Sequence, residues 1–120
     1  YIVHMTYGKH LRAVREALRK TDRAFSLRQV AMRVGIEPAY LSKIERGEVA
    51  PPSEATTRKI AAELGEDADV LLAMSGKVSS ELLAIILKRP QLFADLLRQL
   101  KDAPDKALLR VVREVRDGNW

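Results

Sequence analysis

Residues 26–47 decide the fold of this 120-residue chain; they read SLRQVAMRVGIEPAYLSKIERG. Ser26 is a favourable N-cap residue, and Gln29 three positions later completes the pattern of a capping box. Gly35 interrupts the helical spacing of apolar residues where a positive φ would end a helix, and Pro38 suits the first position of the next helix. The stretch therefore predicts two short amphipathic helices joined by a tight turn.

The same residues carry a family resemblance. The run A-x-x-x-G-I-x-x-x-x-L-S-x-I-E-R-G, from Ala31 to Gly47, resembles the phage-repressor or Xre-type helix-turn-helix family. The resemblance extends from about Tyr7 to about Leu64 and implies a DNA-binding domain whose second motif helix enters the major groove. We expect an all-α protein, with a five-helix repressor-like helix-turn-helix domain in residues 5–75. About three C-terminal helices follow in residues 76–120, as a dimerisation or interaction region.

Composition limits the classes of function. The absence of cysteine excludes disulfides and thiolate metal sites, and it fits a reducing cytoplasm. No apolar run approaches the roughly 18 residues of a membrane span, and no signal-peptide pattern is present. We expect a cytoplasmic, nucleoid-associated protein of a bacterium or phage that uses no metal or other cofactor and binds no membrane. Residues 1–4, ahead of Met5, are interpreted as a remnant of an expression vector.

The positive charge is unevenly distributed along the chain. Residues 1–64 carry 12 Lys/Arg against 7 Asp/Glu, a net charge of +5, whereas residues 65–120 carry 9 of each. The excess positive charge thus falls in the part that holds the motif, which indicates a module that binds an anionic partner, here double-stranded DNA. The alternative is a solvated basic surface without a partner.

The second motif helix supplies the candidates for reading bases, because its N-terminal end must reach the groove floor. Many relatives have glutamine or serine where Pro38 and Ala39 stand, and those side chains bond bases; Pro38 and Ala39 can only pack against thymine methyl groups. Base reading would then fall on Lys43, a donor to guanine, and on Glu37, an acceptor for cytosine. Tyr40 could stack on a sugar or bond a phosphate. The alternatives are a capping role for Glu37 and a solvated Lys43.

The candidates for phosphate contacts are Arg28, Arg33, Ser42 and Arg46. Backbone N–H groups at the start of the first motif helix would add to them. Relatives often have a glutamine where Leu27 stands, and we expect Arg28 to take over that contact.

A structural ion pair is expected between Arg15 and Glu45. In proteins that resemble this one, an arginine at the first position pairs with the glutamate that Glu45 matches. Glu45 falls in the apolar part of the second motif helix, where a buried charge needs a partner. We expect the pair to support the fold without reading DNA.

Smaller expectations concern the other helices of the domain. The first helix is predicted at Tyr7–Thr21, and Ser53 is expected to cap a helix that ends at Leu64. A short helix at Asp67–Met74 is predicted to place Val70, Leu71 and Met74 in the core. His10 has no second ligand at i+4, so it is interpreted as a surface residue.

The C-terminal helices are unusually apolar. They are expected to begin near Ser79, Pro90 and Pro104, and some forty residues cannot enclose so much apolar surface alone. They must pack on the motif domain, on a second copy, or on both, and we favour both. The residues expected to form the dimer interface are Leu82, Leu83, Ile86, Phe93, Leu96, Leu97 and Leu100.

Three functions follow from these patterns, in order of preference. The first is a sequence-specific transcriptional regulator, with repression as its expected action, that binds an inverted-repeat operator as a homodimer. The second is an antitoxin or other regulator whose C-terminal helices bind a partner protein, with autoregulatory DNA binding. The third is a scaffold that bridges proteins without touching DNA. The sequence has no glycine-rich phosphate loop or nucleophile with an evident base, so no enzyme activity is expected.

Overall fold

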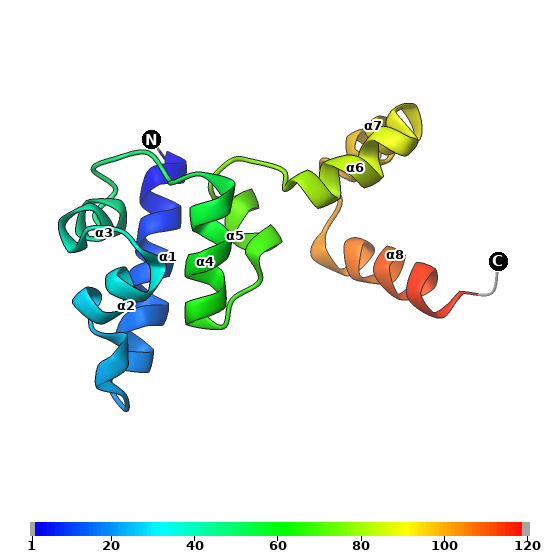
Figure 1. Ribbon diagram of the computed structural model, residues 1–120. Coiled ribbons are helices and arrows are strands. Elements are labelled where there is room, and N and C mark those ends of the chain that lie inside the picture. The colour runs from blue at the N-terminus through cyan, green and yellow to red at the C-terminus, as the bar shows by residue number, and fades with distance from the viewer. Residues whose placement is uncertain (1, 119–120) are drawn as a thin grey trace. The chain divides into compact units, whose positions relative to one another are not determined.

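The computed structural model describes the backbone of residues 2–118 and the side chains of residues 6–118, and every element in this part of the chain is a helix (Figure 1). The all-α prediction is therefore confirmed. The vector-remnant interpretation falls on Tyr1 and on side chains that lie outside the described residues. In chain order the elements are α1 (Ile2–Arg19), the 3₁₀ turn η1 (Arg23–Phe25), α2 (Leu27–Val34), α3 (Pro38–Glu45), α4 (Glu54–Leu64), α5 (Ala68–Met74), α6 (Ser80–Lys88), α7 (Pro90–Leu100) and α8 (Asp105–Asp117).

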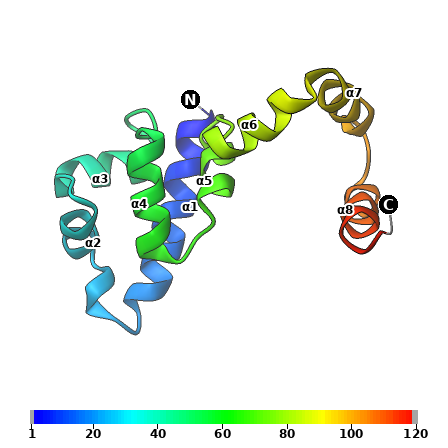
Figure 2. The ribbon, with the colours of Figure 1, turned by 45° about the vertical axis from the view of Figure 1, so that its right-hand side comes forward.

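The chain forms two compact units, Tyr1–Leu82 and Leu83–Trp120. The first unit holds α1 to α5 and the start of α6. In this unit α1 and α4 lie side by side in the middle, with α2 and α3 on one side of them and α5 on the other (Figures 1 and 2). None of the described helices is both long and apolar enough to cross a bilayer.

The core of the first unit draws residues from α1 to α5. A fully buried aliphatic side chain contributes about 1.5–3 kcal/mol to folding, so this cluster is the main source of the unit's stability. Tyr7 is buried with its hydroxyl 2.9 Å from Oγ1 of buried Thr57, so both polar groups are satisfied. The members of the cluster are Tyr7, Leu11, Val30, Ala31, Val34, Leu41, Ile44, Ile60, Ala61, Leu64 and Leu71.

Side-chain caps begin two of the helices as the sequence predicts. Ser26 Oγ accepts from the N–H of Gln29 at 3.2 Å, and Ser53 Oγ accepts from the N–H of Thr56 at 3.3 Å. The Ser26 N–H donates to the carbonyl of Arg23 at 3.1 Å, because η1 directly precedes α2. Only the Ser26 half of the predicted capping box therefore forms.

Two predictions about the helices are wrong. The first helix is α1, Ile2–Arg19, and does not begin at Tyr7, because no residue before Tyr7 breaks a helix. Val70 is 49% exposed, while Leu72 is fully buried in its place. In α5 the five residues Val70–Met74 are all apolar, so their spacing alone does not choose which face turns inward.

The second unit comprises most of α6 together with α7 and α8. Pro90 begins α7 as predicted, and Pro104 is the N-cap of α8. None of the described residues from 83 to 118 is buried. These helices therefore carry apolar side chains without a core of their own.

Candidate nucleic-acid interface

The turn between α2 and α3 is tight and fixed by backbone hydrogen bonds. Gly35 has φ 87°, a left-handed conformation that glycine adopts without strain. The N–H groups of Gly35 and Ile36 both donate to the carbonyl of Ala31, at 2.9 and 3.0 Å. Ala31 is fully buried, and its small side chain lets the two helices come close together. The local sequence thus sets the angle at which α3 leaves α2.

Helix α3 has a buried side and an exposed side. Leu41 and Ile44 are each 1% exposed and belong to the core. The residues expected to read bases lie elsewhere on the helix: Pro38 is half-buried, and Glu37, Ala39, Tyr40 and Lys43 are exposed. The exposed side therefore presents a carboxylate, a methyl group, a phenol and an ammonium group to solvent.

Glu37 occupies the N-cap position of α3, but its side chain makes no capping hydrogen bond. Its backbone carbonyl accepts from the N–H groups of Tyr40 and Leu41, at 3.0 and 3.1 Å. Pro38 follows at the first helical position, where no N–H is needed. The carboxylate of Glu37 is consequently not occupied in capping.

A buried ion pair fixes α3 to α1. Arg15 Nε donates to Glu45 Oε2 at 2.7 Å and Arg15 Nη2 donates to Oε1 at 2.9 Å, a bidentate arrangement. Both residues are buried. The hydrogen bonds that Arg15 donates to the Glu45 carboxylate raise the pKa of Arg15 above its ordinary value, so the arginine stays charged. Arg15 Nη1 also donates to the carbonyl of Phe25 at 3.2 Å, which ties η1 to the same pair.

A glycine lets α1 approach the end of α3. Gly8 is buried, and a Cβ atom built on it would lie 2.8 Å from the carbonyl oxygen of Glu45 and closer still to that of Ile44. Both neighbours are backbone atoms, which cannot move without shifting the helix. The position of α3 thus depends on the absence of a side chain at residue 8.

The residues expected to contact phosphates differ in their exposure and in the partners they already have. Arg28 is exposed and borders a hollow of about 400 Å³ that Glu37 and Pro38 also line. Ser42 is half-buried. Arg46 is half-exposed; its Nε lies 2.8 Å from Oε2 of Glu48.

Arg33 is the most engaged of these candidates. Its Nε donates to both carboxylate oxygens of Glu63 at 3.2 Å, and its guanidinium lies 5.4 Å from the centre of the Phe25 ring. Arg28 and Arg46 are the stronger candidates, because the Arg33 side chain also contacts Phe25 and is only 32% exposed, against 50% for Arg46.

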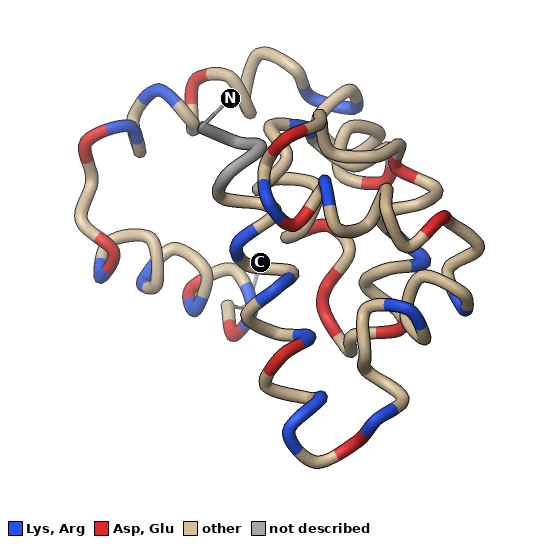
Figure 3. Tube along the Cα trace, turned by 90° about the vertical axis from the view of Figure 1, so that its left-hand side faces the viewer, with Lys and Arg blue, Asp and Glu red and all other residues tan. Residues whose placement is uncertain are grey.

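The net charges of the two compact units differ from those of residues 1–64 and 65–120. The unit Tyr1–Leu82 carries 13 Lys/Arg against 11 Asp/Glu, a net charge of +2, and the unit Leu83–Trp120 carries 8 against 5, a net charge of +3. The acidic residues between 66 and 81 belong to the first unit. Basic and acidic positions are interspersed along the trace in Figure 3. The excess positive charge is therefore not confined to the unit that holds the motif, and α3 carries the support for DNA binding.

His10 has a partner that the sequence did not reveal. Its ring nitrogen Nε2 pairs with Oε1 of Glu66, which follows α4, and both side chains are partly buried. The two residues are 56 positions apart, so no local pattern could connect them. Among the residues with described side chains, no group of three or more possible ligands could hold a metal ion.

The residues expected at a dimer interface are open to solvent. Leu82, Leu83, Leu96 and Leu97 are 38–58% exposed, and the others of this set, Ile86, Phe93 and Leu100, are half-buried. Exposed apolar residues of α8, including Leu109 and Val112, extend this apolar character beyond the set chosen from the sequence.

Comparisons with known proteins agree with the arrangement of α2 and α3. A family model described as a helix-turn-helix domain matches residues 6–74, more than half of the chain. The chain is similar to RghRB of Bacillus subtilis (strain 168), an uncharacterised HTH-type transcriptional regulator, with 35% identity over 74 residues. The similar region covers 62% of this chain and 50% of that protein, so the chain spans about half the length of this relative. No solved structure matches the chain.

Proposed function

Since the chain belongs to the helix-turn-helix domain family, we propose that it is a sequence-specific, DNA-binding transcriptional regulator of the cytoplasm that represses its target. The observation that carries this proposal is α3, which has a buried apolar side, a bidentate ion pair behind it and an exposed polar side. A helix held in this way fits the width of the major groove. The name of the Bacillus relative supports the same class of function.

In this proposal the start of α3 approaches the bases closely. Pro38 and Ala39 are small, and they would pack against thymine methyl groups, while Lys43 donates to guanine O6 or N7. The carboxylate of Glu37 is free of a capping bond and would accept from a cytosine amino group. Tyr40 would contact the sugar–phosphate backbone. Arg28, Ser42 and Arg46 would hold the phosphates, and Arg33 would do so only by leaving Glu63.

The second unit supports a homodimer. One motif reads only a few base pairs, so two copies on an inverted repeat would give useful specificity. The exposed leucines of α6 and α7 offer each copy an apolar face that the other copy can cover. Half-sites would then lie one helical turn apart, or a multiple of it.

The test compares a base-reading variant with a phosphate-binding variant on a site selected from a random duplex pool. Lys43→Ala should relax the preference at one base position and weaken binding by about 1–3 kcal/mol. Arg46→Ala should weaken binding to all sequences alike and reduce the slope of log K against log salt by about 0.9. Glu48→Gln serves as the matched control, because loss of the carboxylate beside Arg46 should strengthen binding instead. If Lys43→Ala and Arg46→Ala behave alike, the assigned roles are wrong; if the wild type selects no site, the function is wrong.

The exposed apolar residues of the second unit also support the alternative of an antitoxin or a related regulator. There the same face would cover a partner protein, and DNA binding would be autoregulatory. Purification of the chain from its native host distinguishes the two, because a stoichiometric second protein in place of a second copy would favour the alternative.

A further inference from the structure

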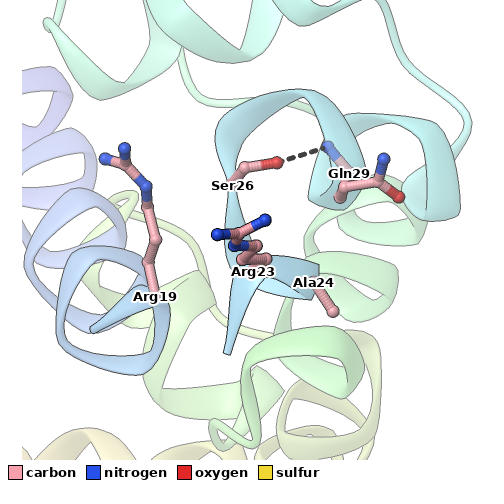
Figure 4. A pocket seen from close by; sticks show the side chains of 5 residues that line it. All are labelled: Arg19, Arg23, Ala24, Ser26 and Gln29. Carbon is pink, nitrogen blue, oxygen red and sulfur yellow. Dashed lines mark hydrogen bonds between the residues drawn. The ribbon is translucent and has the colours of Figure 1, made fainter. Parts of the chain in front are cut away.

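A hollow lined by arginines lies at the corner between α1 and α2. It has a volume of about 550 Å³ and is lined by Arg19, Arg23, Ala24, Ser26 and Gln29. Figure 4 shows Arg19 on α1 and Arg23 on η1, with the first turn of α2 beside them. Neither arginine is among the residues expected from the sequence to contact DNA.

The corner is strongly basic. Residues 19–28 contain four Lys/Arg and a single Asp. That Asp22 carboxylate accepts from the N–H of Ala24 at 2.9 Å and so caps η1. Arg19 pairs with Glu16 at 3.1 Å, but Arg23 is exposed and has no acidic partner within ion-pair distance among the described residues. Arg23 is therefore the cation of the hollow that is available to an anion.

The corner is held in place relative to α3. Arg15 joins Glu45 of α3 to the carbonyl of Phe25 in η1, and the guanidinium of Arg33 lies over the ring of Phe25. The backbone of Arg23 thus belongs to a segment that cannot shift without breaking the hydrogen bond from Arg15 to Phe25. A cation placed in advance loses less freedom when its partner binds.

The lining of the hollow is also close in sequence to the proposed DNA surface. Ser26 and Gln29 flank Arg28 in the first turn of α2, and Arg28 borders the second hollow together with Glu37 and Pro38 at the start of α3. In sequence, a path of basic and polar residues therefore runs from Arg23 past Arg28 toward the start of α3. Neighbouring phosphates of one DNA strand lie close enough together to follow such a path.

We infer that the hollow at the α1–α2 corner binds a phosphodiester of the DNA backbone through Arg23, and that this contact adds one phosphate to those held by Arg28 and Arg46. The inference rests on the proposed function. The volume exceeds that of a phosphate ion and suits a phosphodiester with its flanking sugars. The contact contributes affinity and register and carries no base preference.

The experiment neutralises phosphates one at a time with methylphosphonate in the selected duplex and measures the affinity of each variant. In the wild type, methylphosphonate at one position per half-site should lower the affinity about 3–10-fold, because the neutral group no longer attracts Arg23. Arg23→Gln should show no loss at that position and the wild-type loss at every other position. Arg23→Gln should also reduce the salt slope by about 0.9 and leave the base preference unchanged. Lys59→Gln, which removes an exposed lysine of α4, is the matched control and should keep the wild-type pattern.

If the wild type binds and Arg23→Gln shows the same pattern of losses on methylphosphonate substitution, the inference is wrong. If the wild type binds no duplex, the proposed function is wrong as well. Equal melting temperatures of wild type and Arg23→Gln show that folding is not the cause of a loss. Inorganic phosphate provides a further arm. In an NMR titration, inorganic phosphate that shifts the backbone N–H signals of Ser26 and Gln29 to a plateau would show that the hollow binds a free anion. If the methylphosphonate pattern then does not depend on Arg23, the inference is wrong.

Discussion

At the scale of single residues, Arg15 of α1 connects this helix to both η1 and α3. It donates to Glu45 of α3, to the carbonyl of Phe25 and, at 3.2 Å, to Glu16. Its charge is buried, so each lost partner would leave a polar group without compensation. The proposed DNA-reading helix and the α1–α2 corner both depend on this one residue.

Arg15→Ala should lower the free energy of unfolding by about 3–5 kcal/mol, because it leaves the carboxylate of Glu45 buried and unpaired. Urea denaturation measures this loss. The double variant Arg15→Met with Glu45→Leu removes both charges and should regain most of the stability. A double variant as unstable as Arg15→Ala would contradict the view that the unpaired charge is the cause.

Gly8→Ala tests the close approach of α1 to α3. Helix propensity alone would make this change stabilising by about 0.8–1 kcal/mol. The added Cβ would instead overlap the carbonyl oxygens of Ile44 and Glu45, so we expect a net destabilisation of about 1–3 kcal/mol. The sign of the change in thermal or urea unfolding decides between the two effects.

At the scale of helices, local signals predicted much of the first unit, whereas the pairing of Tyr7 with Thr57 remained hidden. Ser26, Gly35, Pro38 and Ser53 act on their own neighbours, and for this reason the bounds of α2, α3 and α4 follow from the sequence. Thr57 continues the spacing of Ile60, Ala61 and Leu64, so the same pattern could have placed it in the core. The Thr57 hydroxyl pairs with that of Tyr7 and makes the burial of Tyr7 favourable, but the two residues are 50 positions apart, beyond any periodicity.

The candidate site was predicted less completely than the fold. The resemblance named the positions of α3, but it could not show that Glu63 and Glu48 already hold Arg33 and Arg46. Arg23 was missed because a single arginine in a loop has no distinguishing pattern. Its surroundings, η1 and the first turn of α2, exist only after folding.

The link between α4 and the start of α6 should respond to pH. The Ser80 hydroxyl donates to Oε2 of Glu54 at 2.7 Å, and Arg58 donates to the same atom at 3.0 Å. These bonds, that from Ser80 first, lower the pKa of Glu54 below its ordinary value of 4.5. A lowered folded-state pKa means that the stabilisation is present above pH 4.5 and is lost as the pH falls through the folded value.

Glu54→Gln should therefore melt at a lower temperature than the wild type at pH 7, and the difference should shrink as the pH approaches 3. Thermal unfolding followed by circular dichroism over this pH range measures the difference. Glu81→Gln, an exposed residue of α6, is the control and should show little change. A difference for Glu54→Gln that is constant with pH would show that the carboxylate charge has no part in the link.

At the scale of the whole molecule, the two units differ in how they are stabilised. The first has a core of its own, and the second has exposed apolar residues and none that is buried among those described. An arrangement of this kind is stable when another surface covers the apolar face. In the proposed function that surface is a second copy of the chain.

Sedimentation at tens of micromolar should show a dimer for the wild type and a monomer for the double variant Leu83→Glu, Leu97→Glu. Two carboxylates in an apolar interface should weaken dimerisation by at least about 100-fold. Val70→Glu is the matched control, because Val70 is 49% exposed on the first unit and outside the proposed interface. A monomeric wild type, or a dimer that survives the double substitution, would rule out this interface.

The geometry of the Arg15 side chain has one more consequence. Its N–H donors lie in a plane and point in several fixed directions, whereas the donors of an ammonium group radiate from one nitrogen. Arg15→Lys would preserve the electrical balance of the interior, yet one nitrogen could not reach the carboxylate of Glu45 and the carbonyl of Phe25 together in the same way. The directions of the donors therefore matter more than the charge at this position, where one side chain holds both α3 and the α1–α2 corner.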